Sequence, residues 1–225
     1  MVDLGGHQGI SLTAPELEQV TVRYLPTTSK SQNAKGEKLE ARRFVAPNVV
    51  LGNLALGDIE GGESIFGTSV PPDRNGYIGE PVLGRYLLVL DYPSKQIRLY
   101  RSGDSVALQS ECGINTFAVD FANGIATSTA STEFGELEFV WDTGTTHNFL
   151  RPAANATLEK LGRRIDEGPP VVTVSSVVLG GKDFGPQEFR LVPFAAPQVD
   201  GYLGAGLMSS HKVCLDIGKA MGAVL

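Results

Sequence analysis

Residues 75–79 read NGYIG and residues 200–204 read DGYLG, so one short pattern of turn residue, glycine, tyrosine, aliphatic residue and glycine occurs twice. The same tetrapeptide, VVLG, stands upstream of each copy, at residues 49–52 and again at residues 177–180. Two landmarks therefore recur in one order along the chain. This order indicates an internal duplication.

Two further landmarks extend the repeat. Asp3 and Asp142 each begin an Asp-x-Gly tripeptide at the start of a copy, and a Leu-Asp pair ends each copy at residues 90–91 and 215–216. A solenoid needs at least three stacked units, so two copies predict two similar lobes instead. A residue at the centre of two such lobes would itself occur as a pair. The obvious pair is Asp3 and Asp142.

The composition is typical of many short strands joined by tight turns. The chain has 225 residues, of which 42% are hydrophobic, with 27 Gly and 13 Pro. This excludes a helical bundle and a disordered chain and predicts a mainly β, globular protein. The formal net charge of −6, without a long basic run, argues against nucleic acid or an anionic membrane surface as the main partner. It favours an uncharged or basic partner.

The chain contains two cysteines, Cys112 and Cys214. Two are too few for a disulfide framework and have no metal-site spacing, so we interpret both as buried thiols, with a single disulfide as the alternative. No stretch approaches 18 consecutive apolar residues, so no transmembrane helix is expected. Met1 is followed by neither a charged nor an apolar leader region, so we expect no signal peptide in the chain as given.

The second copy reads as a small barrel of short strands. An alternating strand, an Asn-Gly turn at residues 123–124 and an apolar strand lead into Asp142, and a short helix over residues 152–161 stops at Gly162. The expected strands are residues 117–121, 137–141, 171–179, 189–192 and 213–215.

The first copy follows the same plan with two differences. It has a longer, polar and charged segment, which predicts a solvated β-hairpin over residues 24–44. It also has only two residues before Asp3, so the first lobe is expected to be truncated at its N-terminus. Residues 104–116 are polar and read as a connection between lobes. The predicted division is residues 1–103 for the first lobe and residues 117–225 for the second.

The context of the second Asp-x-Gly is more specific than the tripeptide alone. Residues 139–145 read FVWDTGT, an apolar strand feeding the aspartate, and the triplet YLG follows at residues 202–204, with YIG at residues 77–79 in the first copy. By these residues each half resembles one lobe of the aspartic peptidases of the pepsin and retropepsin type. The resemblance implies two similar closed β-barrel lobes related by a pseudo-twofold axis, the acid-protease fold.

The resemblance also implies an aspartic endopeptidase with Asp3 and Asp142 as its catalytic pair. Two carboxylates held about 3 Å apart do not both ionise readily, so they share a proton at acidic pH. One then acts as base on a water molecule while the other polarises the scissile carbonyl of a peptide or unfolded protein substrate. This chemistry needs no cofactor and no metal.

Four supporting residues follow from the same resemblance. Thr143 is expected to reach the backbone of the opposite loop, and Thr145 to hydrogen-bond the aspartate. Gly5 and Gly144 let the backbone of each turn approach its carboxylate, where a β-carbon would crowd it. The hairpin of the first copy lies where such enzymes carry a flap, so Tyr24 is expected to contact substrate; an ordinary solvated loop is the alternative.

The first copy departs from the family pattern at two positions. Leu4 stands where threonine or serine is usual, and Gly6 stands where the second copy has Thr145. Less preorganised support for Asp3 would lower the rate of catalysis. The alternative function is therefore an impaired relative that binds peptides or a protein partner. A third alternative is a dimer formed through the second lobe, although a monomer is favoured over a dimer.

The remaining candidate residues are expected to have ordinary roles. His7, His147 and His211 have no metal-ligand spacing, which favours surface or packing roles. Asp91 and Asp216 are expected to end strands at surface turns. A secreted or periplasmic location is implied by the family resemblance alone.

Overall fold

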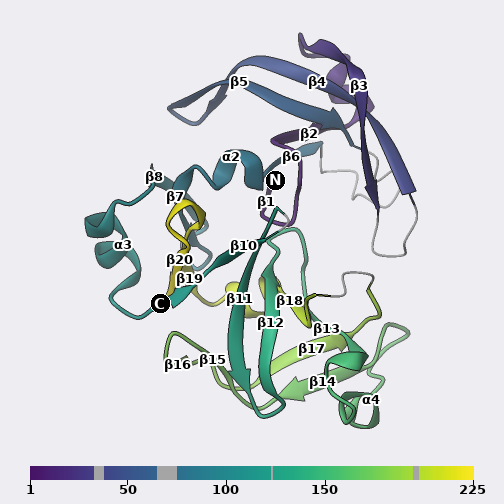
Figure 1. Cartoon of the computed structure of the whole chain (residues 1–225), viewed down its shortest axis with the longest axis vertical. Helices are drawn as coiled ribbons and strands as arrows, with labels where there is room; N and C mark the ends of the chain where they lie inside the picture. The colour runs from purple at the N-terminus through teal and green to yellow at the C-terminus, as the bar shows by residue number, and fades with distance from the viewer. Residues whose placement is uncertain (33–37, 65–74, 123, 195–197) are drawn as a thin grey trace. The chain divides into compact units, whose positions relative to one another are not determined.

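The computed structural model describes residues 1–32, 38–64, 75–122, 124–194 and 198–225 (Figure 1). The prediction of a mainly β protein is confirmed, because strands make up most of the regular structure and the helices are short. The chain divides into two compact units, Met1–Leu83 and Gly84–Leu225. Each unit is described by itself.

The first unit is built on one six-stranded sheet. In pairing order its strands are β1 (Val2–Asp3), β6 (Gly76–Gly79), β2 (Ile10–Leu12), β5 (Leu54–Glu63), β4 (Lys38–Leu51) and β3 (Arg23–Gln32). Its helices are α1 (Ala14–Leu17) and α2 (Glu80–Leu83). Leu17, Phe44 and Ala46 are buried together, so an apolar cluster packs α1 against β4.

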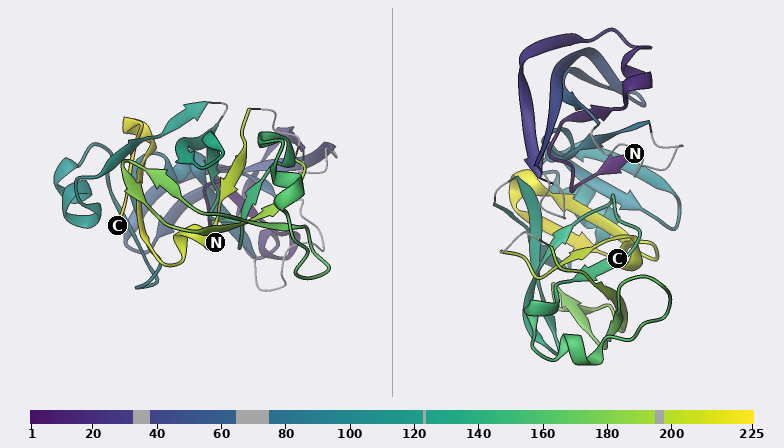
Figure 2. Two further views of the ribbon diagram at one scale, coloured as in Figure 1. Left: turned by 90° about the horizontal axis from the view of Figure 1, so that it is seen from below. Right: turned by 90° about the vertical axis from the view of Figure 1, so that its right-hand side faces the viewer.

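The hairpin predicted over residues 24–44 is confirmed. Strands β3 and β4 pair antiparallel from Arg23 opposite Val45 to Gln32 opposite Lys38, and Figure 2 shows them as long neighbouring ribbons at the purple and blue end of the chain. Residues 33–37 at its tip lie outside the described part of the chain. Ion pairs from Arg42 to Glu63 and from Arg43 to Glu60 join β4 to β5. They neutralise two of the positive charges of the hairpin.

The repeated VVLG tetrapeptide forms the same feature in both units. In the first unit it ends β4, and Gly52, at φ +61°, turns the chain into β5. In the second unit it forms β15 (Val177–Leu179), and Gly180, at φ +56°, turns the chain into β16 (Lys182–Asp183). Both turns need a left-handed backbone, which glycine adopts without strain. The repeat in sequence thus marks two equivalent hairpins.

The second unit contains two sheets. In the larger sheet, β14 (Val171–Val174), β17 (Gln187–Leu191), β13 (Asn148–Leu150), β18 (Gly201–Leu203), β12 (Gly135–Trp141), β11 (Ile125–Thr132), β15 and β16 pair in that order, and β10 (Asp120–Ala122) also pairs with β11. The smaller sheet has the order β8 (Gln96–Arg101), β7 (Tyr86–Asp91), β19 (Lys212–Asp216), β20 (Met221–Val224) and β9 (Thr116–Ala118). The short helices η2 (Pro152–Ala154), α4 (Leu158–Leu161), α5 (Ala205–Met208) and η3 (Ile217–Lys219) join these strands.

The segment predicted as a connection, residues 104–116, contains a helix instead. Asp104 caps α3 (Ser105–Cys112) by accepting a hydrogen bond from Ala107 N, which is the usual role of aspartate at a helix start. The buried side of α3 packs on the small sheet. Because β7, β8 and α3 belong to the second unit, the boundary between the compact units falls between residues 83 and 84, earlier in the chain than the predicted division.

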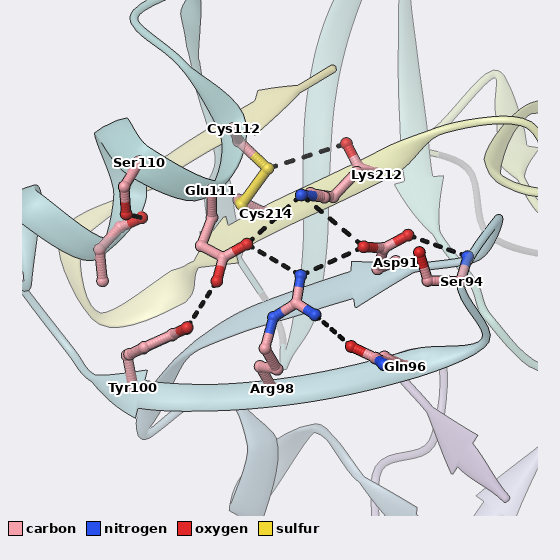
Figure 3. Close-up of polar contacts among 11 residues, drawn as sticks. Asp91, Ser94, Gln96, Arg98, Tyr100, Ser110, Glu111, Cys112, Lys212 and Cys214 are labelled. Carbon is pink, nitrogen blue, oxygen red and sulfur yellow. Dashed lines mark hydrogen bonds and ion pairs between the residues drawn. A yellow bond between two sulfur atoms is a disulfide. The ribbon is translucent and has the colours of Figure 1, made fainter.

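The two cysteines are joined in a disulfide, so their interpretation as free thiols is wrong. Cys112 of α3 and Cys214 of β19 lie with their Cα atoms 6.2 Å apart and are both buried. Beside the disulfide, Glu111 accepts hydrogen bonds from Tyr100 (2.5 Å) and Arg98 (2.8 Å), and Lys212 lies 3.4 Å from its carboxylate (Figure 3). A covalent bond and a charged cluster therefore hold α3 on the sheet.

Three elements of the second copy are interrupted where the sequence predicts continuity. The strand predicted over residues 171–179 forms β14 and β15, which are not neighbours in the sheet. The stretch 152–161 forms η2 and α4 separately, because the Asn155 side chain accepts hydrogen bonds from the backbone and hydroxyl of Thr157 and competes with the helix. The alternation at residues 117–121 is split between β9 and β10, which belong to different sheets. Gly162 does end α4, since its N–H bonds to the carbonyl of Leu158.

Candidate active site

The turn at Asp142 is built by two strands of the second unit. Strand β12 delivers Asp142 and pairs in parallel with β18, and Asp142 N donates to the carbonyl of Leu203 at 3.0 Å. Past the strand end, Gly144 N donates to Asp142 Oδ1 at 2.8 Å, and Thr145 N lies 3.4 Å from the carbonyl of Asp142. The aspartate side chain thus accepts a backbone hydrogen bond from its own turn, which fixes the orientation of the carboxylate.

The turn at Asp3 repeats this geometry within the first unit. Strand β1 pairs in parallel with β6, with Asp3 opposite Gly79. Gly5 N donates to Asp3 Oδ1 at 3.0 Å, and Gly6 N donates to the carbonyl of Asp3 at 3.1 Å. Each Asp-x-Gly is therefore an Asx turn closed by the glycine N–H.

The strands that carry the YIG and YLG triplets have equivalent neighbours. Strand β6 lies between β1, which is parallel to it, and β2, which is antiparallel; β18 lies likewise between β12 and β13. A short helix follows each, α2 after β6 and α5 after β18. The two units thus share a local arrangement around an aspartate, as the sequence repeat predicts.

The predicted supporting residues lie at the turns. Thr145 Oγ1 lies 3.3 Å from the carbonyl of Asp142 and donates to the carbonyl of His147 at 3.0 Å, so this hydroxyl holds the backbone of the turn. Thr143 is half-buried between Asp142 and Gly144. Asp3 and Asp142 belong to different units, so their action as a pair remains a prediction, as do the roles of these threonines.

The two departures of the first copy have physical reasons. Leu4 is fully buried, so it contributes apolar packing where a hydroxyl is usual. A β-carbon added to Gly6 would come within 2.5 Å of Cε2 of Tyr77 and 3.1 Å of the carbonyl of Asp3. The ring of Tyr77 therefore occupies the space that a side chain at Gly6 would need.

Three tyrosines near the aspartates were missed by sequence reasoning. Burial raises the pKa of Tyr77 to about 12, and the carboxylate of Asp3 adds to the rise. Burial and then the charge of Asp142 likewise raise the pKa of Tyr92 and Tyr202. These phenols stay neutral through the acidic and neutral range. The tyrosine repeated in the two triplets was the sequence signal that could have indicated Tyr77 and Tyr202. Tyr92 lies outside the triplets, and no sequence pattern marks it.

Tyr24, the predicted substrate contact, lies near the base of the β3–β4 hairpin opposite Phe44. It is 45% exposed, and the guanidinium of Arg42 lies 4.8 Å from the centre of its ring. The ring of Tyr24 therefore has a packing partner on the sheet. Its contact with substrate remains a prediction.

The histidines have ordinary surroundings. His147 is exposed, stacks on Phe149 with ring centres 6.4 Å apart, and lines a pocket of about 250 Å³ in the second unit, whose wall includes the ion pair of Arg190 and Asp166. His211 Nδ1 donates a 2.8 Å hydrogen bond to the carbonyl of Leu207. Within the described ranges, no group of three or more His, Cys, Asp or Glu side chains is arranged to hold a metal ion.

Asp91 and Asp216 end β7 and β19, as predicted, but both are buried, so the prediction that they lie at the surface is wrong. Asp216 accepts hydrogen bonds from Ser102 Oγ (2.7 Å) and Gly103 N (2.6 Å). The backbone N–H of Ser94 and the side chain of Arg98 lower the pKa of Asp91. Strands β7 and β19 pair antiparallel, and in this pairing Asp91 lies opposite Lys212, four residues from Asp216. The two aspartates are therefore separated by about 13 Å along the strands. They are structural anchors and do not form a second carboxylate pair.

Comparison with solved structures identifies the fold. The aspartic proteinase from Irpex lacteus matches with a TM-score of 0.64 at 13% identity, covering 99% of this chain and 88% of that chain. Conglutin gamma, a basic 7S globulin from lupine seeds, matches with a TM-score of 0.57 at 9% identity, covering 99% of this chain and 86% of that chain. A retropepsin-like aspartic protease from Rickettsia conorii covers 49% of this chain and 91% of its own, at 20% identity and a TM-score of 0.36.

The chain therefore has the fold of the aspartic proteinases, as the resemblance of its motifs implied. No protein-family model matches the sequence, and no curated protein matches it. At these identities the likeness establishes the fold alone. A protein named a proteinase and a protein named a globulin share it. None of the helices in the described ranges has the length and apolar character needed to cross a membrane.

Proposed function

We propose that this protein is an aspartic endopeptidase, with Asp3 and Asp142 as a pair of carboxylates that activates water. The observation that carries the proposal is the repeated turn: each aspartate ends a strand, pairs in parallel with a Tyr-x-Gly strand and accepts a hydrogen bond from the glycine two residues on.

The proposed reaction uses these groups alone. One carboxylate accepts a proton from the bound water as the water oxygen attacks the peptide carbonyl, and the protonated partner donates its proton to the carbonyl oxygen. Collapse of the tetrahedral species then breaks the C–N bond and returns a proton to the nitrogen. The backbone hydrogen bonds from Gly5 and Gly144 keep one oxygen of each carboxylate oriented during these transfers.

The substrate class follows from the acidic composition and the endopeptidase chemistry. A net charge of −6 favours a neutral or basic polypeptide segment, bound extended. We propose a secreted or periplasmic location as well. The Cys112–Cys214 disulfide supports it, because disulfides persist in oxidising compartments.

The test is cleavage of an unfolded protein at acidic pH by the natural chain and by Asp142→Asn and Asp3→Asn. We expect cleavage that is insensitive to chelators and to serine or cysteine reagents, and at least about a hundredfold loss in either variant. Full activity in either substituted protein would remove the corresponding aspartate from the mechanism.

The second candidate function is binding of peptides or a protein partner without cleavage. Leu4 and Gly6 favour it, since the first copy lacks both hydroxyls of the family pattern, and so does the globulin among the structural neighbours. Peptide binding without product formation, by the natural chain and both variants alike, would support this second function over the first.

A further inference from the structure

The turn that holds Asp3 has an aromatic neighbour where the second copy has a threonine. A β-carbon on Gly6 would lie 2.5 Å from Cε2 and 3.0 Å from Cδ2 of Tyr77, both closer than van der Waals contact permits. The backbone of Gly6 is itself tied to Asp3 through a 3.1 Å hydrogen bond. The ring of Tyr77 therefore packs on the backbone of the turn that orients Asp3.

Tyr77 is held in place from its other side. It lies on β6 opposite Ser11 of β2, and the buried Ser11 hydroxyl hydrogen-bonds the phenol oxygen. Two residues further along β6, Gly79 lies opposite Asp3. Strand β6 thus carries both the ring that packs on the turn and the glycine opposite Asp3.

The electrostatic environment keeps this phenol protonated. Burial and the Asp3 carboxylate raise the pKa of Tyr77 to about 12, so it retains its O–H at any pH where a carboxylate pair would work. A phenol O–H that donates a hydrogen bond to a carboxylate favours the ionised form of that carboxylate. His7 on the same turn, Glu80 at the end of β6 and the Met1 amino group are the other titratable groups of the flanking elements.

The second copy has a different arrangement at the equivalent turn. Thr145 supplies the hydroxyl that holds the turn of Asp142. Tyr202 packs edge-on against Phe194, with ring centres 5.0 Å apart. The same tyrosine of the repeat therefore has a separate packing partner where a threonine is present.

We propose that Tyr77 is the positioning residue for Asp3, and that its ring and phenol take the place that Thr145 has at Asp142. This inference rests on the proposed peptidase function. It explains why the first copy tolerates Gly6: the absence of a side chain there makes room for the ring. Gly6 is then part of an alternative support for the turn that orients Asp3.

The first test is a titration that does not depend on activity. In protein labelled with ¹³Cζ-tyrosine, we expect Asp3→Asn to lower the pKa of Tyr77 by at least about 0.5 unit, because the neighbouring negative charge is removed. Asp142→Asn is the matched control, and it should lower the pKa of Tyr92 and Tyr202 while lowering that of Tyr77 less than Asp3→Asn does. An unchanged Tyr77 in Asp3→Asn would overturn the proposal, even if the protein has no peptidase activity.

The second test is an exchange of supports. Tyr77→Phe keeps the ring and should lower kcat about tenfold, with KM little changed and the acid limb of the pH–rate profile moved to higher pH. Tyr77→Val should lose more, and Tyr77→Val with Gly6→Thr should regain at least part of that loss, since removing the ring makes room for the threonine. A pH–rate profile of Tyr77→Phe identical to that of the natural chain would overturn the proposal.

Discussion

The backbone of Gly204 lies directly against the side chain of Thr145: a β-carbon on Gly204 would come within 2.1 Å of Thr145 Oγ1 and 2.4 Å of the carbonyl of His147. Gly79 in the first unit is equally confined, because a β-carbon on it would come within 2.1 Å of the carbonyl of Gln8 and 2.5 Å of that of Gly6. The last residue of each Tyr-x-Gly triplet is thus a glycine because a neighbouring turn passes over it.

This contact predicts a large cost for Gly204→Ala. The backbone carbonyl of His147 has no room to move without breaking the turn of Asp142, so we expect a loss of about 3 kcal/mol or more in the free energy of unfolding. Urea denaturation measures it. An unfolding midpoint equal to that of the natural chain would show that the strand and the turn are less closely packed than described.

Removal of the disulfide is predicted to destabilise the second unit. The bond joins residues 102 positions apart, and its loss in Cys112→Ser with Cys214→Ser should cost about 2 to 5 kcal/mol, because the unfolded chain regains the freedom of a long loop. The thermal midpoint should fall by roughly 5 to 15 °C. Dithiothreitol should reproduce the fall in the natural chain and have no effect on the double variant. Equal midpoints in all samples would contradict this role.

The charged cluster beside the disulfide predicts a dependence of stability on pH. Hydrogen bonding from Tyr100, then from Arg98, lowers the pKa of Glu111 in the folded chain below its ordinary 4.5. A depressed pKa contributes stability that is present above the unfolded value and lost as the pH falls through the folded value. Glu111→Gln should therefore be less stable than the natural chain at pH 6 and lose less stability between pH 5 and pH 3. Parallel stability curves for the two proteins would show that Glu111 is not coupled to folding.

Leu4→Thr tests the first departure from the family pattern, with Leu4→Val as the matched control of equal shape. Because Leu4 is fully buried, both changes should lower stability, by about 1 to 4 kcal/mol. Higher turnover in the threonine variant than in the valine variant would mean that its hydroxyl reaches a productive partner. A threonine variant less stable than the valine variant, without a gain in turnover, would mean that the hydroxyl is buried without one. If neither turnover nor unfolding midpoint differs from the natural chain, the link between Leu4 and Asp3 is wrong.

The repeated landmarks could be predicted from sequence because they are local. Glycines at φ above zero, such as Gly52 and Gly180, and an apolar strand ending in Asp142 each mark a turn wherever the rest of the chain lies. The long hairpin was also predictable, from its length and charge. These features fix the fold class and the two aspartates without knowledge of tertiary contacts.

Other features depend on contacts that no local pattern encodes. Whether Cys112 meets Cys214 depends on α3 packing against β19, over a separation of 102 residues. The burial of Asp91 and Asp216 follows from a sheet that joins strands of both copies. Gly6 reads in sequence as a missing hydroxyl, and its contact with Tyr77 shows a second reason for glycine at that position.

The most direct test of the proposed carboxylate pair is a ¹³C NMR titration of the aspartate side chains, compared between the natural chain and Asp3→Asn. The account predicts that Asp142 titrates in the natural chain with two steps that belong to the pair, and that in Asp3→Asn it titrates in a single step, because the partner that shared its proton is gone. If the titration curve of Asp142 is the same in both proteins, the two carboxylates do not share a proton and the proposed mechanism is contradicted.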